Sequence, residues 1–255
     1  MLGRIEQLST GSRAVVAIGR AARGDAADVT ARMAREAGMK GIVLVDTAEA
    51  LVEALAEARV DAAVRGTLPA EEVLHHLRGA TRARAPGRAA LMDMGGGGRA
   101  LLLCPVGIDE GRTVAQRWRL LEASARAVAA LGEVPRVGVM SKGRPDDASR
   151  GADIARSIRE CEELVRRAGR AHIDATATHI LVERAVGECN VLVAPDGVTG
   201  NLTFRLLHYV AGHDAWGALA LHLLPLVYVD TSRDKSDFLG AVRWARAAAA
   251  MRERA

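Results

Sequence analysis

Short apolar runs alternate with longer segments of helical periodicity along most of this chain. Residues 15–18, 42–45 and 62–65 are three of the apolar runs, and a helical segment rich in alanine, glutamate or arginine follows each of them. Strands that alternate with helices in this way are typical of βαβ units, which build a parallel sheet. The alternation therefore predicts an α/β fold with a parallel or mixed sheet.

The alternation is interrupted once, near the middle of the chain. Residues 89–94 and 100–104 are two apolar runs joined by four consecutive glycines. Two strands around a glycine-rich turn predict an antiparallel hairpin. Because no helix opens at the glycines, they do not match a dinucleotide-binding or P-loop fingerprint.

This interruption provides the domain boundary that the sequence predicts. One lobe comprises residues 1–106 plus 225–255, and the second α/β lobe comprises residues 107–224. The last helix, expected from about 237 to 252, then packs on the N-terminal lobe through Phe238, Val242 and Ala245. Ligands commonly bind in clefts between two such lobes. Within the second lobe the pattern predicts strands at 136–140 and 190–194 and helices at 113–131, 151–168, 176–186 and 202–210.

Composition excludes several classes of protein. Hydrophobic residues make up 49% and charged residues 26% of the 255, which is usual for a globular protein. The most apolar stretch, residues 218–229, contains His222 and Pro225 and falls short of the roughly 20 residues of a membrane span. The N-terminus has no apolar export signal. We therefore expect a cytoplasmic protein that does not bind membranes.

Charge and cysteine usage narrow the possible partners. The net charge is only +4, the basic residues are scattered, and aromatic residues make up 3%, so we expect no nucleic-acid partner. The three cysteines form no Cys-x-x-Cys pair. His75 and His76 are adjacent, and His208 and His213 are five apart, which is not the spacing of a helical metal-ligand pair. We expect no metal.

Three loops that follow predicted strands carry polar residues suited to a site, because ligands bind at the carboxyl ends of strands in α/β sheets. The first loop is Ser141-Lys142-Gly143. A hydroxyl, an ammonium and free backbone N–H groups ahead of a helix can hold an anion. An ordinary solvated turn explains the same residues.

The second loop follows the strand at 190–194 and contains Asp196, Thr199, Gly200 and Asn201. Thr199 can cap the following helix without any further role. Asp196 and Asn201 are interpreted as a carboxylate and an amide that point into the cleft.

The third loop follows the last strand and contains Ser232, Arg233 and Asp237. Arg233 can hold a phosphate and Asp237 can remove a proton. The alternative is a capping segment, in which Ser236 or Asp237 caps the last helix.

Taken in order, these segments resemble the phosphate acetyltransferase and butyryltransferase family. The segments that carry the resemblance are residues 13–19, 60–66, 123–143, 190–201 and 230–233. Strand-Pro-Asp-loop-Gly-Asn at 190–201 is the most specific of them, and Asp-Thr-Ser-Arg at 230–233 is similar to the family's Asp-Leu-Ser-Arg signature.

The resemblance implies a two-lobed fold of the isocitrate/isopropylmalate dehydrogenase type, a homodimer, and acyl transfer between coenzyme A and phosphate. No cofactor would be tightly bound, because coenzyme A, or a similar thiol, and phosphate are the anionic small-molecule substrates. Arg233 would hold phosphate, Ser232 would contact the thiol, and Asp237 would be the base. The other site residues that the resemblance implies are Ser141, Asp196, Gly200 and Asn201. The family's further phosphate or coenzyme A arginines could fall on Arg78, Arg82, Arg84 or Arg88.

The chain also departs from the family pattern. It has Thr231 where the family has leucine, Asp234 where it has glycine, and Ser141-Lys142-Gly143 where it has Ser-x-Ser/Thr. In size and in these departures the chain resembles the archaeal branch called methanogenesis marker protein 4, which is described as methyltransferase-related. The alternative function is therefore a non-catalytic protein that binds an anion or cofactor in methyl-transfer or methanogenesis metabolism.

Overall fold

The computed structural model describes residues 1–81, 87–96, 98–223, 225–232 and 235–252. The chain folds into two compact units. Unit 1 comprises Met1 and residues 87–214, and unit 2 comprises residues 2–86 and 215–255. The units therefore divide at 86/87 and 214/215, whereas the sequence places the boundaries at 106/107 and 224/225. The hairpin of residues 88–104 accounts for the first difference, because its second strand pairs with a strand of unit 1.

Unit 2 is built on a sheet with the strand order β2-β1-β3-β10-β9. The first four strands are parallel, and β9 is antiparallel to β10. Their bounds are β1 (Val16–Gly19), β2 (Ile42–Val45), β3 (Ala62–Val64), β9 (Asp214–Ala220) and β10 (Val227–Asp230). Because β1, β2, β3 and β10 run in the same direction, their carboxyl ends and the polar loops that follow lie along one edge.

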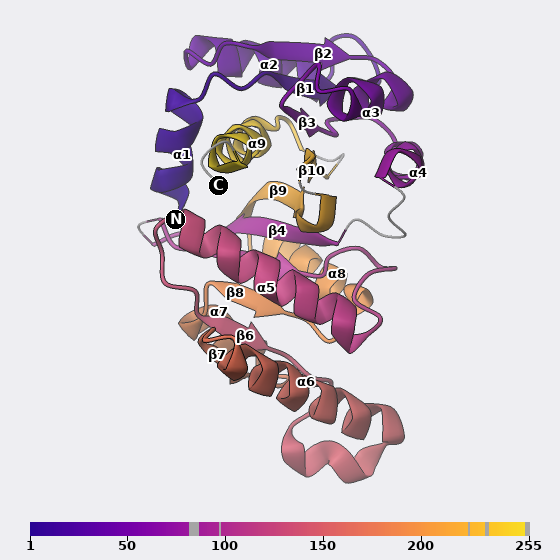
Figure 1. Ribbon diagram of the computed structural model, residues 1–255, viewed down its shortest axis with the longest axis vertical. Coiled ribbons are helices and arrows are strands. Elements are labelled where there is room, and N and C mark those ends of the chain that lie inside the picture. Colours follow the sequence, from indigo (N-terminus) through magenta and orange to yellow (C-terminus); the bar gives the residue numbers. More distant parts are fainter. Residues whose placement is uncertain (82–86, 97, 224, 233–234, 253–255) are drawn as a thin grey trace. The chain divides into compact units, whose positions relative to one another are not determined.

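Helices cover the sheet of unit 2. Their bounds are α1 (Leu2–Gly11), α2 (Ala26–Glu36), α3 (Ala48–Ala56), α4 (Ala70–Thr81) and α9 (Leu239–Arg252), with a short 3-10 turn at Leu221–Leu223. A buried cluster on one face joins α3 and α4 to Ala17, Ala63 and Tyr228 of the strands. Helix α9 lies in unit 2, where it packs against α1, α2 and strands β1, β3 and β10 (Figure 1).

Unit 1 contains a sheet with the strand order β4-β5-β8-β6-β7. The strands are β4 (Arg88–Asp93), β5 (Ala100–Cys104), β6 (Val137–Val139), β7 (Ala175–Ala177) and β8 (Val191–Val193). Strands β4 and β5 form the predicted antiparallel hairpin, with Leu91 opposite Leu102. Strands β5, β8, β6 and β7 are parallel. The sheets of the two units confirm the mixed α/β class.

Helices α5 (Val114–Ala130) and α6 (Ala152–Arg170) pack on one face of this sheet, and α8 (Gly197–Arg205) lies on the other (Figure 1). Helix α7 (Val182–Glu188), a 3-10 turn at Pro145–Arg150 and a π-helical turn at Leu206–Val210 complete the unit. Helix α6 turns Ile158, Cys161, Leu164 and Ala168 inward, the spacing expected of an amphipathic helix.

One local prediction is wrong, and one helix was not predicted. The sequence predicts a helix at 176–186, but residues 175–177 form strand β7 and the helix begins at Val182. The alternating Ala-Thr-Ala segment has a free edge of β6 to pair with, and sheet pairing overrides its weak helical preference. Helix α1 was not expected, although Ile5 and Leu8 give it a buried face.

Candidate functional site

The candidate site in unit 1 lies at the carboxyl ends of β6 and β8. These strands are parallel neighbours, so the loops that follow them emerge side by side. Lys142 belongs to the first loop and Asp196 to the second, and Lys142 Nζ lies 3.2 Å from Asp196 Oδ2. Fractional side-chain exposures of 41% and 27% leave this ion pair accessible to a ligand. The structure therefore brings together two of the sequence-predicted residues.

Asp196 also caps α8. Its Oδ1 accepts hydrogen bonds from the backbone N–H of Thr199 at 2.8 Å and from the Thr199 hydroxyl at 2.9 Å. The cap is therefore Asp196, not Thr199 as the sequence suggested. Burial by itself raises the pKa of Asp196, but these bonds and the Lys142 ammonium outweigh it and hold the pKa below its ordinary value. Asp196 is thus a carboxylate at neutral pH.

Stability is expected to depend on pH through Asp196. Because its pKa is lowered in the folded state, its stabilising effect is complete above the unfolded value of about 3.9 and disappears as pH falls through the folded value. Asp196→Asn keeps a good cap but removes the charge. We expect the variant to be less stable than wild type at pH 7 by about 1 kcal/mol or less, and this deficit to shrink toward pH 3 in urea titrations. A deficit that is constant with pH would contradict this account.

Ser141 is fully buried and makes two contacts at the end of β6. Its hydroxyl donates to the carbonyl of Gly143 at 2.8 Å, and Oγ lies 2.9 Å from Nδ1 of His179. His179 follows β7, the neighbour of β6 on the other side. Sequence reasoning missed this residue, because only the strand order shows that the loops after β6 and β7 meet.

Cys161 of α6 is buried near Ser141 and donates its thiol hydrogen to the carbonyl of Val139 at 3.3 Å. Burial raises the pKa of this thiol to about 12. Cys161 is therefore protonated at neutral pH and is not a nucleophile in this state.

Gly200 and Asn201 connect α8 to the segment after β5. A Cβ at Gly200 would lie 1.9 Å from the carbonyl oxygen of Pro105, so only glycine permits this approach. The Asn201 amide donates to the carbonyl of Val106 at 2.8 Å. Both residues have structural roles that fix the position of α8, and with it the position of Asp196.

The third predicted loop belongs to unit 2. Ser232 is half-buried after β10, and Arg233 and Asp234 lie outside the described residues. Asp237 Oδ1 accepts the backbone N–H of Leu239 at 2.9 Å, which is the geometry of a cap for α9. Its role as a base stays a prediction. Among the candidate arginines, Arg82 and Arg84 lie outside the described residues, and Arg88 forms a buried ion pair with Glu110 at 2.7 Å.

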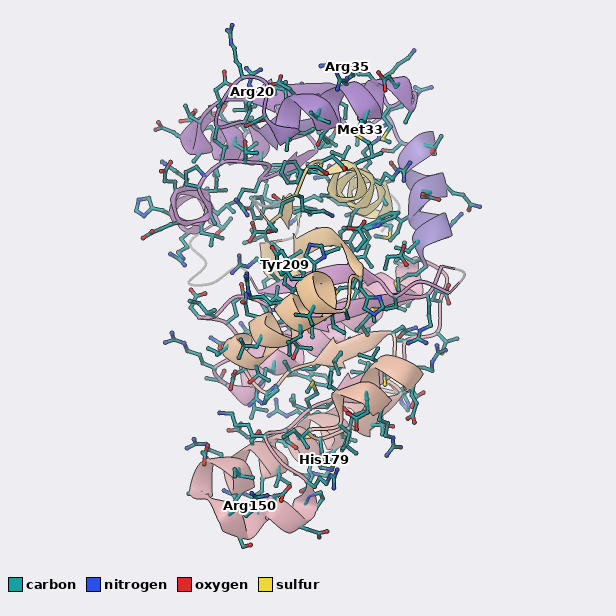
Figure 2. The ribbon with its side chains drawn as sticks, turned by 180° about the vertical axis from the view of Figure 1, so that it is seen from behind. Arg20, Met33, Arg35, Arg150, His179 and Tyr209 are labelled. Atoms are coloured by element: carbon teal, nitrogen blue, oxygen red, sulfur yellow. The ribbon has the colours of Figure 1, made fainter. Side chains whose placement is uncertain are left out.

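The carboxyl edge of unit 2 contains two arginines whose ion pairs the sequence did not suggest. Arg20, at the end of β1 and labelled in Figure 2, donates to Asp46 at 2.7 and 3.1 Å and to Asp28 of α2 at 3.0 Å. The hydrogen bonds that Arg20 donates to Asp46 and Asp28 raise its pKa. Arg65 Nε lies 2.5 Å from Asp230 Oδ1. The pairs with Asp46 and Asp230 join the ends of neighbouring strands, and the pair with Asp28 joins the end of β1 to α2.

The described part of the chain contains no group of three or more histidine, cysteine, aspartate or glutamate side chains arranged for a metal ion. Over the same residues, none of the helices combines the length and the apolar character that crossing a membrane requires.

Comparisons with known proteins place the chain in a family. The chain is 39% identical over 207 residues to methyltransferase mtx subunit X of Methanosarcina barkeri, over 80% of this chain and 76% of that protein. It is 39% identical over 201 residues to an uncharacterized methyltransferase of Methanopyrus kandleri, over 78% of each. The methyltransferase assignment in the Methanosarcina name is itself provisional. No protein-family model matches the chain.

Solved structures show the fold. A branched-chain phosphotransacylase from Enterococcus faecalis superimposes with a TM-score of 0.69 at 14% identity, over 92% of this chain and 99% of that one. The EutD phosphotransacetylase from Staphylococcus aureus superimposes with a TM-score of 0.64 at 14% identity, over 98% of both chains. The chain therefore has the phosphotransacylase fold and belongs to the family of the methyltransferase mtx subunit X proteins of methanogens.

Proposed function

We propose that this protein transfers an acyl group between phosphate and coenzyme A, or a thiol like it. The observation that carries the proposal is the cluster of Ser141, Lys142 and Asp196 at the carboxyl edge of a phosphotransacylase fold. An exposed ammonium beside a strand end suits a phosphate, because a compact charge can contact any phosphate oxygen. Asp196 keeps this ammonium in place while no ligand is bound.

The reaction places modest demands on the protein. A thioester carbonyl attacked by phosphate needs the two reactants held close together, charge stabilisation for the oxyanion and removal of a proton. In this proposal Lys142 and the Ser141 loop bind the phosphate. The roles of Ser232, Arg233 and Asp237 stay predictions. The homodimer also stays a prediction, which sedimentation velocity tests.

The direct test is phosphate-dependent release of free thiol from acetyl-, butyryl- and malonyl-coenzyme A. A charge-assisted contact contributes about 1.5–3 kcal/mol, so Lys142→Gln is expected to raise KM for phosphate roughly ten- to a hundredfold. Arg150→Gln is the matched control, since Arg150 is an exposed cation in the same unit (Figure 2) whose contact is Asp147 at 3.0 Å. If wild type releases no thiol from any of the three, acyl transfer to phosphate is wrong.

A second candidate function follows from the names of the relatives, which describe methyltransferases. In this alternative the protein keeps the anion site and acts as a non-catalytic partner in methyl transfer. It predicts binding of phosphate or a phosphorylated cofactor, measured as a thermal shift that Lys142→Gln abolishes, without thiol release. No shift with any such ligand would exclude it.

A further inference from the structure

We infer that His179 is the proton acceptor for an oxyanion ligand at the carboxyl edge of unit 1, held for that task by Ser141. The inference begins with the Ser141 hydroxyl, which has a single hydrogen. The carbonyl of Gly143 can only accept, so this hydrogen bond takes the Ser141 proton. At His179 the bond of 2.9 Å must then be donated by Nδ1–H to Ser141 Oγ.

This assignment determines the state of the other ring nitrogen. A neutral imidazole protonated on Nδ1 has its lone pair on Nε2. Within the described residues Nε2 makes no hydrogen bond, and it is not among the buried side-chain atoms that lack a partner. The ring is half-buried, so Nε2 is open to a ligand. His179 therefore presents a base of fixed tautomer.

The backbone conformation of His179 also indicates that its ring is held in a fixed position. His179 has φ of +53°, in the left-handed region that costs a non-glycine residue roughly 1 kcal/mol or more. The preceding residue, Thr178, holds this conformation through bonds from its N–H at 2.9 Å and its hydroxyl at 3.2 Å to the carbonyl of Val139. The Ser141 hydroxyl thus contacts the ring, and the Val139 carbonyl holds the backbone that carries it.

The ligand that this arrangement suits is a protonated oxyanion such as hydrogen phosphate. Lys142, next to Ser141 in sequence, supplies the positive charge, and Nε2 accepts the hydrogen of the phosphate hydroxyl. Asp237, the base predicted from sequence, already accepts a backbone hydrogen bond as a helix cap. His179, in contrast, contacts Ser141 through its ring nitrogen Nδ1 at 2.9 Å.

The catalytic part of this inference rests on the proposed function, and its step balances. A phosphate oxygen attacks the thioester carbon and forms a C–O bond, while the phosphate proton moves to Nε2. The C–S bond then breaks, the thiolate leaves with its electron pair, and Nε2–H returns the proton to sulfur. The products are an acyl phosphate and a free thiol, and His179 regains its starting state.

The kinetic test compares His179→Asn with His172→Asn. Asparagine tolerates the left-handed region, and His172 has φ of +56° in the same unit but is exposed and follows α6. We expect His179→Asn to lower kcat about a hundredfold or more, with KM for phosphate changed less than about threefold. We expect His172→Asn to match wild type. If the two variants have the same kcat, His179 is not the base.

A second measurement judges the inference even if wild type shows no thiol release, in which case the proposed function alone has failed. Nitrogen NMR of protein labelled in its histidines, assigned by the signals that His179→Asn loses, reports which ring nitrogen carries the proton. We expect protonated Nδ1, and a shift of the Nε2 signal on addition of inorganic phosphate that Lys142→Gln suppresses. A proton on Nε2, or an Nε2 signal that phosphate does not move, overturns the inference.

Discussion

Replacing Arg246 with methionine is expected to lower the free energy of unfolding by about 3 kcal/mol or more, because hydrogen bonds to a charged group contribute about 1.5–3 kcal/mol each. Arg246 of α9 is 2% exposed and donates to carbonyls at 3.0 Å (Ser9), 2.9 Å (Ala14) and 2.6 Å (Lys40), and also to the carbonyl of Ser12. Methionine fills much of the volume but takes the guanidinium donors away from these carbonyls, two of which belong to the buried residues Ser9 and Ala14.

The same contacts explain why a buried arginine is tolerated there. Burial lowers the pKa of Arg246, because the charged form loses its water. Several carbonyl dipoles replace that water, and Ser9 lies in the last turn of α1, where carbonyls need donors. One side chain thus ties the end of α1 to α9.

Arg243→Met is the control for this prediction. Arg243 lies on the same helix, and its ion pair with Glu6 at 2.9 Å is partly exposed. Exposed pairs contribute about 0–1 kcal/mol, so this variant should remain within about 1 kcal/mol of wild type. Urea unfolding of both variants measures the difference. Equal losses would show that Arg246 contributes no more than a surface arginine.

Replacing Gly200 with alanine is expected to destabilise unit 1 by about 1–3 kcal/mol or more, as overpacking does in a close-packed interior. The added Cβ would meet the Pro105 carbonyl oxygen at 1.9 Å, and a backbone atom cannot rotate away as a flexible side chain can. Helix α8 must therefore move. Because Asp196 caps this helix, the Lys142–Asp196 pair should move with it.

Gly169→Ala is the matched control. Gly169 lies within α6 of the same unit, and nothing surrounds the position of its Cβ within 4 Å. Alanine there should stabilise the protein by about 0.5–1 kcal/mol, since glycine is the poorer helix former. The midpoint temperature of thermal unfolding should therefore fall for Gly200→Ala and rise for Gly169→Ala. A Gly200→Ala variant as stable as wild type would show that α8 can shift freely.

Several features of this protein are determined by local sequence. Apolar residues recur about every 3.6 positions in a half-buried helix and form a short continuous run in a buried strand. The alternation of these two patterns establishes the α/β class. The four glycines between residues 94 and 99 establish the hairpin that pairs Leu91 with Leu102. The strand-Pro-Asp loop at 190–201 identifies a strand end that carries Asp196, because a charged residue directly after an apolar run marks the point where the buried strand ends.

Tertiary structure alone decided which of these strand ends meet. Residues 176–186 have weak helical preference, and only the free edge of β6 turns residues 175–177 into β7. That pairing brings His179 to Ser141 across 38 positions of sequence, and the order of β8 and β6 brings Asp196 to Lys142. Hydrogen bonds between strands do not depend on side-chain identity, so the sequence around each loop does not encode its neighbour. The site is therefore a product of strand order, which packing of the whole unit selects.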